Sequence, residues 1–90
     1  MDVKQAKKVE RVFKGVANHW RVRILKLIDK NEGINLEKIA ENLKGNMKTI
    51  SEHTKKLQRA GLVNKKYSGR SVVHETSPYG KRVIKFIKSF

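Results

Sequence analysis

The chain has 90 residues, which is enough for one small domain over residues 1–90 and not for two. Its 22 lysines and arginines face only 8 aspartates and glutamates, and the formal net charge of +14 favours a polyanionic partner such as nucleic acid or an anionic membrane surface. Cysteine is absent, which excludes disulfides, thiolate metal sites and cysteine nucleophiles. No apolar run approaches the ~20 residues of a membrane span, and no secretory signal is visible, so we expect a cytoplasmic protein.

The positive charge is concentrated in the second half of the chain. Residues 1–43 carry 10 basic and 6 acidic side chains, a net charge of +4, whereas residues 44–90 carry 12 and 2, a net charge of +10. The excess therefore falls on the helix, hairpin and tail that follow residue 43.

Three helices are predicted in the first half. Apolar residues recur at three- and four-residue spacing over 3–14, and Gly15 is expected to interrupt or end this helix. Asn18 is a suitable N-cap for the second helix, because its side chain can accept a hydrogen bond from a free backbone N–H. Asn35 can cap the third helix in the same way, over residues 36–43.

A fourth, basic helix is predicted over residues 46–60, with Asn46 as its N-cap and Gly61 as its left-handed stop. One face is apolar: Met47, Ile50, Leu57 and Ala60. The other face is polar: Lys48, Thr49, Glu52, Lys55 and Lys56.

A hairpin and a last helix are predicted after the fourth helix. Residues 62–67 and 71–76 have strand-like composition, and Ser68-Gly69 between them signals a hairpin turn. Ser77 and Pro78 then suit the N-cap and first position of a helix. That helix carries more apolar surface than is needed to cover one small core.

Helix, turn, basic helix and basic hairpin together are typical of a winged helix-turn-helix. We expect a mainly α fold with a small β-hairpin (α+β), of about five helices and a two-stranded wing over residues 64–75. Helix 46–60 is expected to enter the major groove of duplex DNA, while the wing contacts flanking backbone or the minor groove. The candidate DNA-binding residues are Asn46, Lys48, Thr49, Ser51, Glu52, Lys55, Lys56, Lys65, Lys66 and Arg70.

No metal, cofactor or catalytic site is predicted. The three histidines are scattered without the close spacing of a zinc site, so structural or surface roles are expected. There is no phosphate-cradling glycine loop, no HExxH and no nucleophile elbow, so the protein is not expected to be an enzyme.

Several segments resemble the ArsR-like winged-helix repressors. They are residues 13–25 (FKGVANHWRVRIL), 39–43 (IAENL), 49–53 (TISEH), 55–57 (KKL), 60–63 (AGLV), 68–70 (SGR) and 77–80 (SPYG). The sequence departs from the family at Gly45, where leucine is common and where Met47 is expected to fill the space. Thr54 also replaces a frequent leucine, and the paired cysteines and other metal ligands of the metal-sensing members are missing.

The resemblance implies a homodimer joined through the first and last helices. The candidate contact residues are Val9, Val12, Phe13, Ile84, Ile87 and Phe90. It also implies a sequence-specific transcriptional repressor. Two alternatives stay open at this point: a nonspecific architectural DNA-binding protein, and a winged helix that binds another protein.

Overall fold

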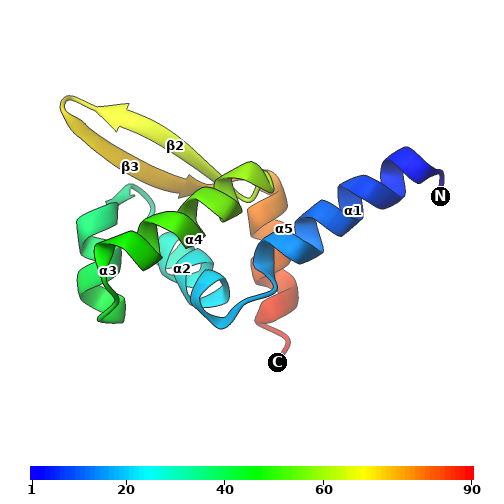
Figure 1. The fold of residues 1–90 in the computed structure, drawn as a ribbon, viewed down its shortest axis with the longest axis horizontal. Coiled ribbons are helices and arrows are strands. Elements are labelled where there is room, and N and C mark those ends of the chain that lie inside the picture. The colour runs from blue at the N-terminus through cyan, green and yellow to red at the C-terminus, as the bar shows by residue number, and fades with distance from the viewer.

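A computed structural model describes all 90 residues as five helices and three short strands (Figure 1). In chain order they are α1 (Val3–Val16), α2 (His19–Lys30), β1 (Ile34–Asn35), α3 (Leu36–Leu43), α4 (Met47–Arg59), β2 (Val63–Ser68), β3 (Ser71–Thr76) and α5 (Pro78–Ile87). The five helices and the β2–β3 hairpin confirm the predicted winged helix-turn-helix. None of the helices is long and apolar enough to cross a membrane.

Each predicted N-cap is confirmed. The side chains of Asn18, Asn35, Asn46 and Ser77 each accept a hydrogen bond from a backbone N–H in the first turn of α2, α3, α4 and α5. Such a bond satisfies a donor that the helix itself leaves free, and typically contributes about 0.5–2 kcal/mol. These four local caps fix where the helices begin and therefore how long each loop is.

Helix α1 runs two residues further than the sequence predicts, because Gly15 lies inside the helix rather than ending it. Gly15 is buried against Ala60 at the end of α4. The glycine therefore serves a close approach of two helices, and α1 ends only at Val16.

The core lies between α2, α3, α4, the base of the hairpin and α5. Eleven buried residues form it: Ile24, Leu25, Ile28, Ile39, Ala40, Ile50, Leu57, Ala60, Leu62, Val63 and Ile84. Helix α2 contributes three of them and packs against α3, α4 and α5, so it is the centre of the fold. Figure 1 shows α1 projecting away from this body toward the N-terminus.

The expected role of Met47 is wrong. Its side chain is 45% exposed, and the space beside Gly45 is filled by others. A β-carbon at Gly45 would lie 2.8 Å from Cδ1 of Ile50 and 3.1 Å from Cζ3 of Trp20. Ile50 and Trp20 therefore occupy the volume that a leucine would take in the turn.

The sheet has three strands rather than the two predicted. Strand β1 pairs antiparallel with β3, with Ile34 opposite His74, and the strand order is β1-β3-β2. His74 is buried, and its Nδ1 lies 3.0 Å from the carbonyl oxygen of Ile34. The extra strand thus anchors the wing to the loop before α3. Burial lowers the pKa of His74, and its bond to Ile34 only partly opposes this, which fits the structural role expected of it.

Candidate nucleic-acid interface

Helix α4 presents a polar face to solvent while its other face is buried. Lys48, Glu52, Lys55 and Lys56 are exposed, whereas Ile50, Thr54 and Leu57 lie in the interior. Thr54, at the position where leucine is common, donates its hydroxyl to the carbonyl oxygen of Ile50 at 2.7 Å. This internal bond satisfies the buried hydroxyl. The helix is therefore anchored along one side and free to contact a ligand along the other.

Three of the residues expected to contact base edges are only partly free to do so. Asn46 is exposed, but its Oδ1 accepts from the backbone N–H of Thr49 at 2.8 Å, so only its amide NH₂ is free to donate. Thr49 and Ser51 are half-buried. Ser51 lines a hollow between α4 and the hairpin that also includes Lys55, Lys65 and Val72.

The wing supplies a second set of cations beside α4. Arg70 follows Gly69 at the exposed hairpin tip, where the glycine adopts φ +62°. Lys65 is exposed near the hairpin base and borders a hollow of about 310 Å³ with Lys55 of α4. Lys66 forms a cross-strand ion pair with Glu75 at 3.0 Å, so its charge is partly compensated.

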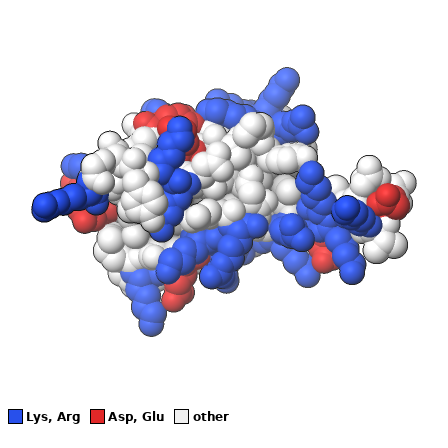
Figure 2. Space-filling view, turned by 90° about the horizontal axis from the view of Figure 1, so that it is seen from above, with Lys and Arg blue, Asp and Glu red and all other residues white.

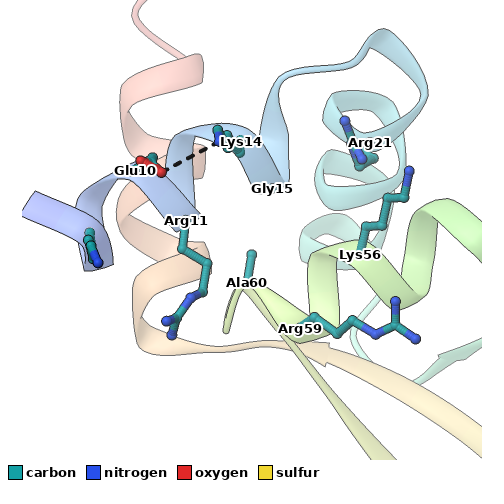
Figure 3. A pocket seen from close by; sticks show the side chains of 9 residues that line it. Glu10, Arg11, Lys14, Gly15, Arg21, Lys56, Arg59 and Ala60 are labelled. Atoms are coloured by element: carbon teal, nitrogen blue, oxygen red, sulfur yellow. Dashed lines mark ion pairs between the residues drawn. The ribbon is translucent and has the colours of Figure 1, made fainter.

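A further basic cluster, which the sequence interpretation missed, lies where α1, α2 and the end of α4 meet (Figure 3). We call it the basic pocket; its volume is about 550 Å³, and it opens to solvent. Its lining residues are Lys7, Glu10, Arg11, Lys14, Gly15, Arg21, Lys56, Arg59 and Ala60. The sequence signal was the spacing of residues 7, 11 and 14, which places three cations on one face of α1.

His53 lies close to this cluster, and both burial and nearby positive charge affect its pKa. Its pKa is lowered, first by burial and then by the positive charges of Arg21 and Lys56. Its Nδ1 is buried without a hydrogen-bond partner, as is Nε of Arg21. The two side chains are thus held in a positive, partly desolvated environment at the junction of α2 and α4.

An apolar groove of about 540 Å³ runs between α1 and α5. Of the six residues expected at a dimer contact, Val9, Val12, Phe13 and Ile87 line it. Ile84 instead belongs to the core and is 3% exposed, so it has no surface to offer a partner. The groove is completed by residues that were not expected there: Val16, Val22, Tyr79, Val83 and Phe86 among them.

Phe90 lies outside the groove and is 94% exposed. Its ring packs edge-on against Phe86, with centroids 5.4 Å apart. Phe86 is itself 61% exposed, so these two rings extend the apolar surface of α5 toward the C-terminus.

The structure shows no group of three or more His, Cys, Asp or Glu side chains placed to hold a metal ion.

Solved structures with this architecture include regulators from three bacteria. HlyU of Vibrio cholerae, in its reduced form, is 26% identical, with a TM-score of 0.81 over 93% of this chain and 88% of HlyU. The homodimeric winged helix-turn-helix DNA-binding domain of a possible ArsR-family regulator from Mycobacterium bovis is 25% identical, with a TM-score of 0.85 over 99% and 85%. The repressor PagR of Bacillus anthracis, at 20% identity and a TM-score of 0.86 over 96% and 99%, shares the fold.

No protein with a curated description matches the sequence. The family model that matches is that of the MarR family, and it covers residues 18–71, from the cap of α2 to the start of β3. The match thus spans the helix-turn-helix and the first strand of the wing, while the likeness to ArsR-like regulators is carried by the solved structures. The chain therefore belongs to the MarR family, and its fold is that of winged-helix transcriptional regulators.

Proposed function

We propose that this protein is a homodimeric, sequence-specific DNA-binding transcriptional repressor that docks on DNA as ArsR-like regulators do. The observation that carries the proposal is the placement of exposed Lys48, Lys55 and Lys56 on α4 beside Lys65 and Arg70 of the wing. The buried face of α4 anchors the backbone that carries Lys48, Lys55 and Lys56, so a duplex meets these three lysines on a helix that is packed against the core.

The residues of this surface divide into two roles. Lysines 55, 56, 65 and 66 contact mainly phosphates, which position the protein without identifying the sequence. Thr49, Ser51 and Glu52, with the free NH₂ of Asn46, face base edges, and Glu52 can accept from a cytosine amino group. Lys48 stands at the N-terminal turn of α4, where free backbone N–H groups also favour a phosphate. Arg70 reaches the flanking backbone or the minor groove.

The apolar groove between α1 and α5 supports the homodimer. Phe13 is 62% exposed and Phe86 is 61% exposed on its two sides, and large apolar side chains at such exposure are typical of an interaction surface. A twofold axis at this groove presents two α4 helices to one face of a duplex. We expect half-sites about one helical turn apart, ~34–36 Å, in a roughly palindromic operator.

The proposal treats residues 1–90 as one domain in which α1 and α5 serve the dimer and α4 and β2–β3 serve DNA. It requires no cofactor, metal or catalytic step. It also places the protein in the cytoplasm, together with the DNA that it regulates.

The experiment that tests the proposal selects tight binders from a random duplex pool and then measures affinity for selected and unselected sequences. A regulator binds the selected sequence at least about 10³-fold more tightly than random DNA. Selection that returns a palindrome supports the dimeric regulator. Tight binding without an enriched sequence rejects it.

A second candidate is an architectural protein that binds DNA without sequence preference. The net charge of +14 on 90 residues favours it, because nonspecific affinity comes almost entirely from phosphate contacts. Equal affinity for selected and random duplexes is the result that this candidate predicts.

A further inference from the structure

The basic pocket gathers six cations around one open space. Lys7, Arg11 and Lys14 come from α1, Arg21 from α2, and Lys56 and Arg59 from α4. Figure 3 shows Lys56 and Arg21 reaching toward one another, and Arg11 extending from α1 beside Ala60. Like charges gathered without a counter-ion repel each other, so a bound anion would stabilise the arrangement.

The protein supplies almost no compensating negative charge in this pocket. Glu10 is the only carboxylate that lines it, and it pairs with Lys14 at 3.5 Å. Both side chains of that pair are more than half exposed, so the pair is weak. The other five cations form no ion pair.

Helix dipoles account for only part of the cluster. Lys14, Lys56 and Arg59 lie in the last turns of their helices, where a cation is favoured by about 0.3–1 kcal/mol. Lys7 and Arg11 lie in the interior of α1, and Arg21 lies near the start of α2, where a cation is disfavoured. Nε of Arg21 is buried without a partner, although Nη2 of this residue donates to the carbonyl oxygen of Ala17 at 3.3 Å.

The ligand chemistry that fits is phosphate on an extended chain. Guanidinium and ammonium groups are the usual phosphate donors, and Arg binds phosphate oxygens in pairs. Only one of the nine lining residues, Ala60, is apolar, whereas sites for small organic ligands are mainly apolar and enclosed. An open, polar, cationic pocket therefore suits a nucleic-acid backbone better than a compact effector.

The pocket is continuous with the face proposed to contact DNA, because Arg59 lines both the basic pocket and the hollow that Lys55 and Lys65 border. A helix of 13 residues is about 20 Å long, and the major groove is ~12 Å wide. When the N-terminal turn of α4 is at base edges, the last turn is near the phosphates that border the groove. Figure 2 shows Lys and Arg side chains in a band along one edge of the molecule, extending toward the end where α1 projects.

We infer that the basic pocket binds the sugar-phosphate backbone of the same duplex, beyond the contacts of α4 and the wing. The inference rests on the proposed function. It assigns phosphate contacts to Lys7, Arg11, Arg21 and Arg59, and it makes α1 part of the DNA-binding surface. Helix α1 then has two working faces, because the apolar groove uses residues 5, 8, 9, 12, 13 and 16 and the pocket uses residues 7, 10, 11, 14 and 15. A dimer formed at the groove leaves the pocket open to DNA.

The test compares two double variants that each remove two positive charges. Lys7→Gln/Arg11→Gln alters the α1 side of the pocket, and Lys26→Gln/Lys85→Gln is the control, because these two exposed lysines line none of the described pockets and form no ion pair. Glutamine keeps a good helix propensity at all four positions. Affinity for a 30-base-pair random-sequence duplex is measured by fluorescence anisotropy between about 50 and 200 mM salt.

Each lost phosphate contact makes the fall of log affinity with log salt shallower by about 0.9. We expect the absolute slope of the pocket variant to be smaller than the wild-type value by about 1 to 2, and that of the control to stay near the wild-type value. Equal slopes for the two variants would overturn the inference. If the pocket variant melts at a lower temperature than the control, the charge-conserving variant Lys7→Arg/Arg11→Lys must restore the wild-type slope, and its failure to do so also overturns the inference.

The outcomes separate this inference from the proposed function. If the wild-type protein binds DNA and Lys48→Ala weakens it, while the pocket variant matches the control, the pocket inference alone fails. If the wild-type protein does not bind DNA at low salt, the proposed function fails first. A titration with inorganic pyrophosphate tests the other source of phosphate. If the backbone amide signals of the pocket residues saturate at micromolar pyrophosphate in NMR spectra, while the pocket variant keeps the wild-type salt slope for DNA, the ligand is a free phosphate compound rather than the DNA backbone.

Discussion

Gly15 of α1 lies against Ala60 at the C-terminal end of α4 so closely that a β-carbon added at Gly15 would overlap Cβ of Ala60. This approach fixes how the N-terminal helix is placed against the rest of the domain. It brings Arg11 and Lys14 of α1 beside Lys56 and Arg59 of α4. It also turns the opposite side of α1 toward α5, where the two helices form the apolar groove.

Gly15→Ala should therefore destabilise the protein, by about 1–3 kcal/mol, which is the usual cost of overpacking. In a helix without such a neighbour the same change is stabilising by up to about 1 kcal/mol. Urea unfolding followed by circular dichroism gives the free energy of unfolding. The double variant Gly15→Ala/Ala60→Gly transfers the methyl group across the contact and should recover most of the loss. Gly15→Ala that is more stable than wild type would contradict the close approach.

Lys48→Ala and Arg70→Ala should each weaken DNA binding about three- to tenfold at low salt without unfolding the protein. Both side chains are exposed and form no ion pair, so their loss removes DNA contacts rather than internal ones. Anisotropy gives the affinity, and thermal melting checks the fold. Lys26→Ala, on the exposed side of α2, is the matched control. Unchanged affinity in both variants would reject the docking face.

Phe13→Glu and Phe86→Glu should each convert the dimer to a monomer, because each places a charge in the apolar groove. Light scattering at micromolar concentration measures the mass. Tyr67→Glu is the control, since Tyr67 is a comparably exposed aromatic residue, 76% exposed, on the wing. A wild-type protein that is already monomeric would refute the dimer, and so would variants that remain dimeric.

The helix N-caps and the bounds of α3 were predictable because their signals are local. Asn35 and Lys44-Gly45 bound α3, and the predicted range of residues 36–43 is the one observed. Gly61, at φ +79°, ends α4 as expected, and Leu62 packs into the core. In each case a side chain and a backbone group a few residues apart make the decisive contact.

The misses are contacts between distant parts of the chain. Strand β1 has only two residues, and it exists because Ile34 pairs with His74, forty positions later. Gly15 was expected to end a helix, but the structure places it inside α1 because it lies against Ala60. The basic pocket was missed for the same reason: the spacing of Lys7 and Arg11 defines a face of α1, but nothing local indicates that this face meets α4.

Acid should destabilise the fold through an ion-pair cluster that joins α2 to α5. Nζ of Lys81 lies 2.8 Å from Oδ1 of Asp29 and 2.8 Å from Oε1 of Glu32. The hydrogen bond from Lys81 is the main cause that lowers the pKa of Asp29. Burial alone would raise the pKa of Glu32, but hydrogen bonds from Lys81 and Thr76 outweigh it and the net pKa is lowered.

Because both carboxyl pKa values are lower in the folded state, the unfolded chain binds more protons in acid. The stabilisation is complete above about pH 5 and is lost as the pH falls through the ordinary carboxyl range near 4 and below. Lys81→Gln should lower the melting temperature at pH 7. Between about pH 5 and 3, the melting temperature of this variant should decrease less than that of the wild type. Lys85→Gln, on the same helix without an ion pair, should behave as wild type. Parallel melting curves for Lys81→Gln and wild type across this range would contradict the cluster's role.

The most direct test of the central claim is fluorescence anisotropy on a random-sequence duplex pool, titrated across salt and followed by selection of the tightest binders. We predict affinity that falls steeply with salt and a selected sequence with twofold symmetry and half-sites about one helical turn apart. The absence of binding even at low salt would contradict the account and would point to a protein partner for this winged helix.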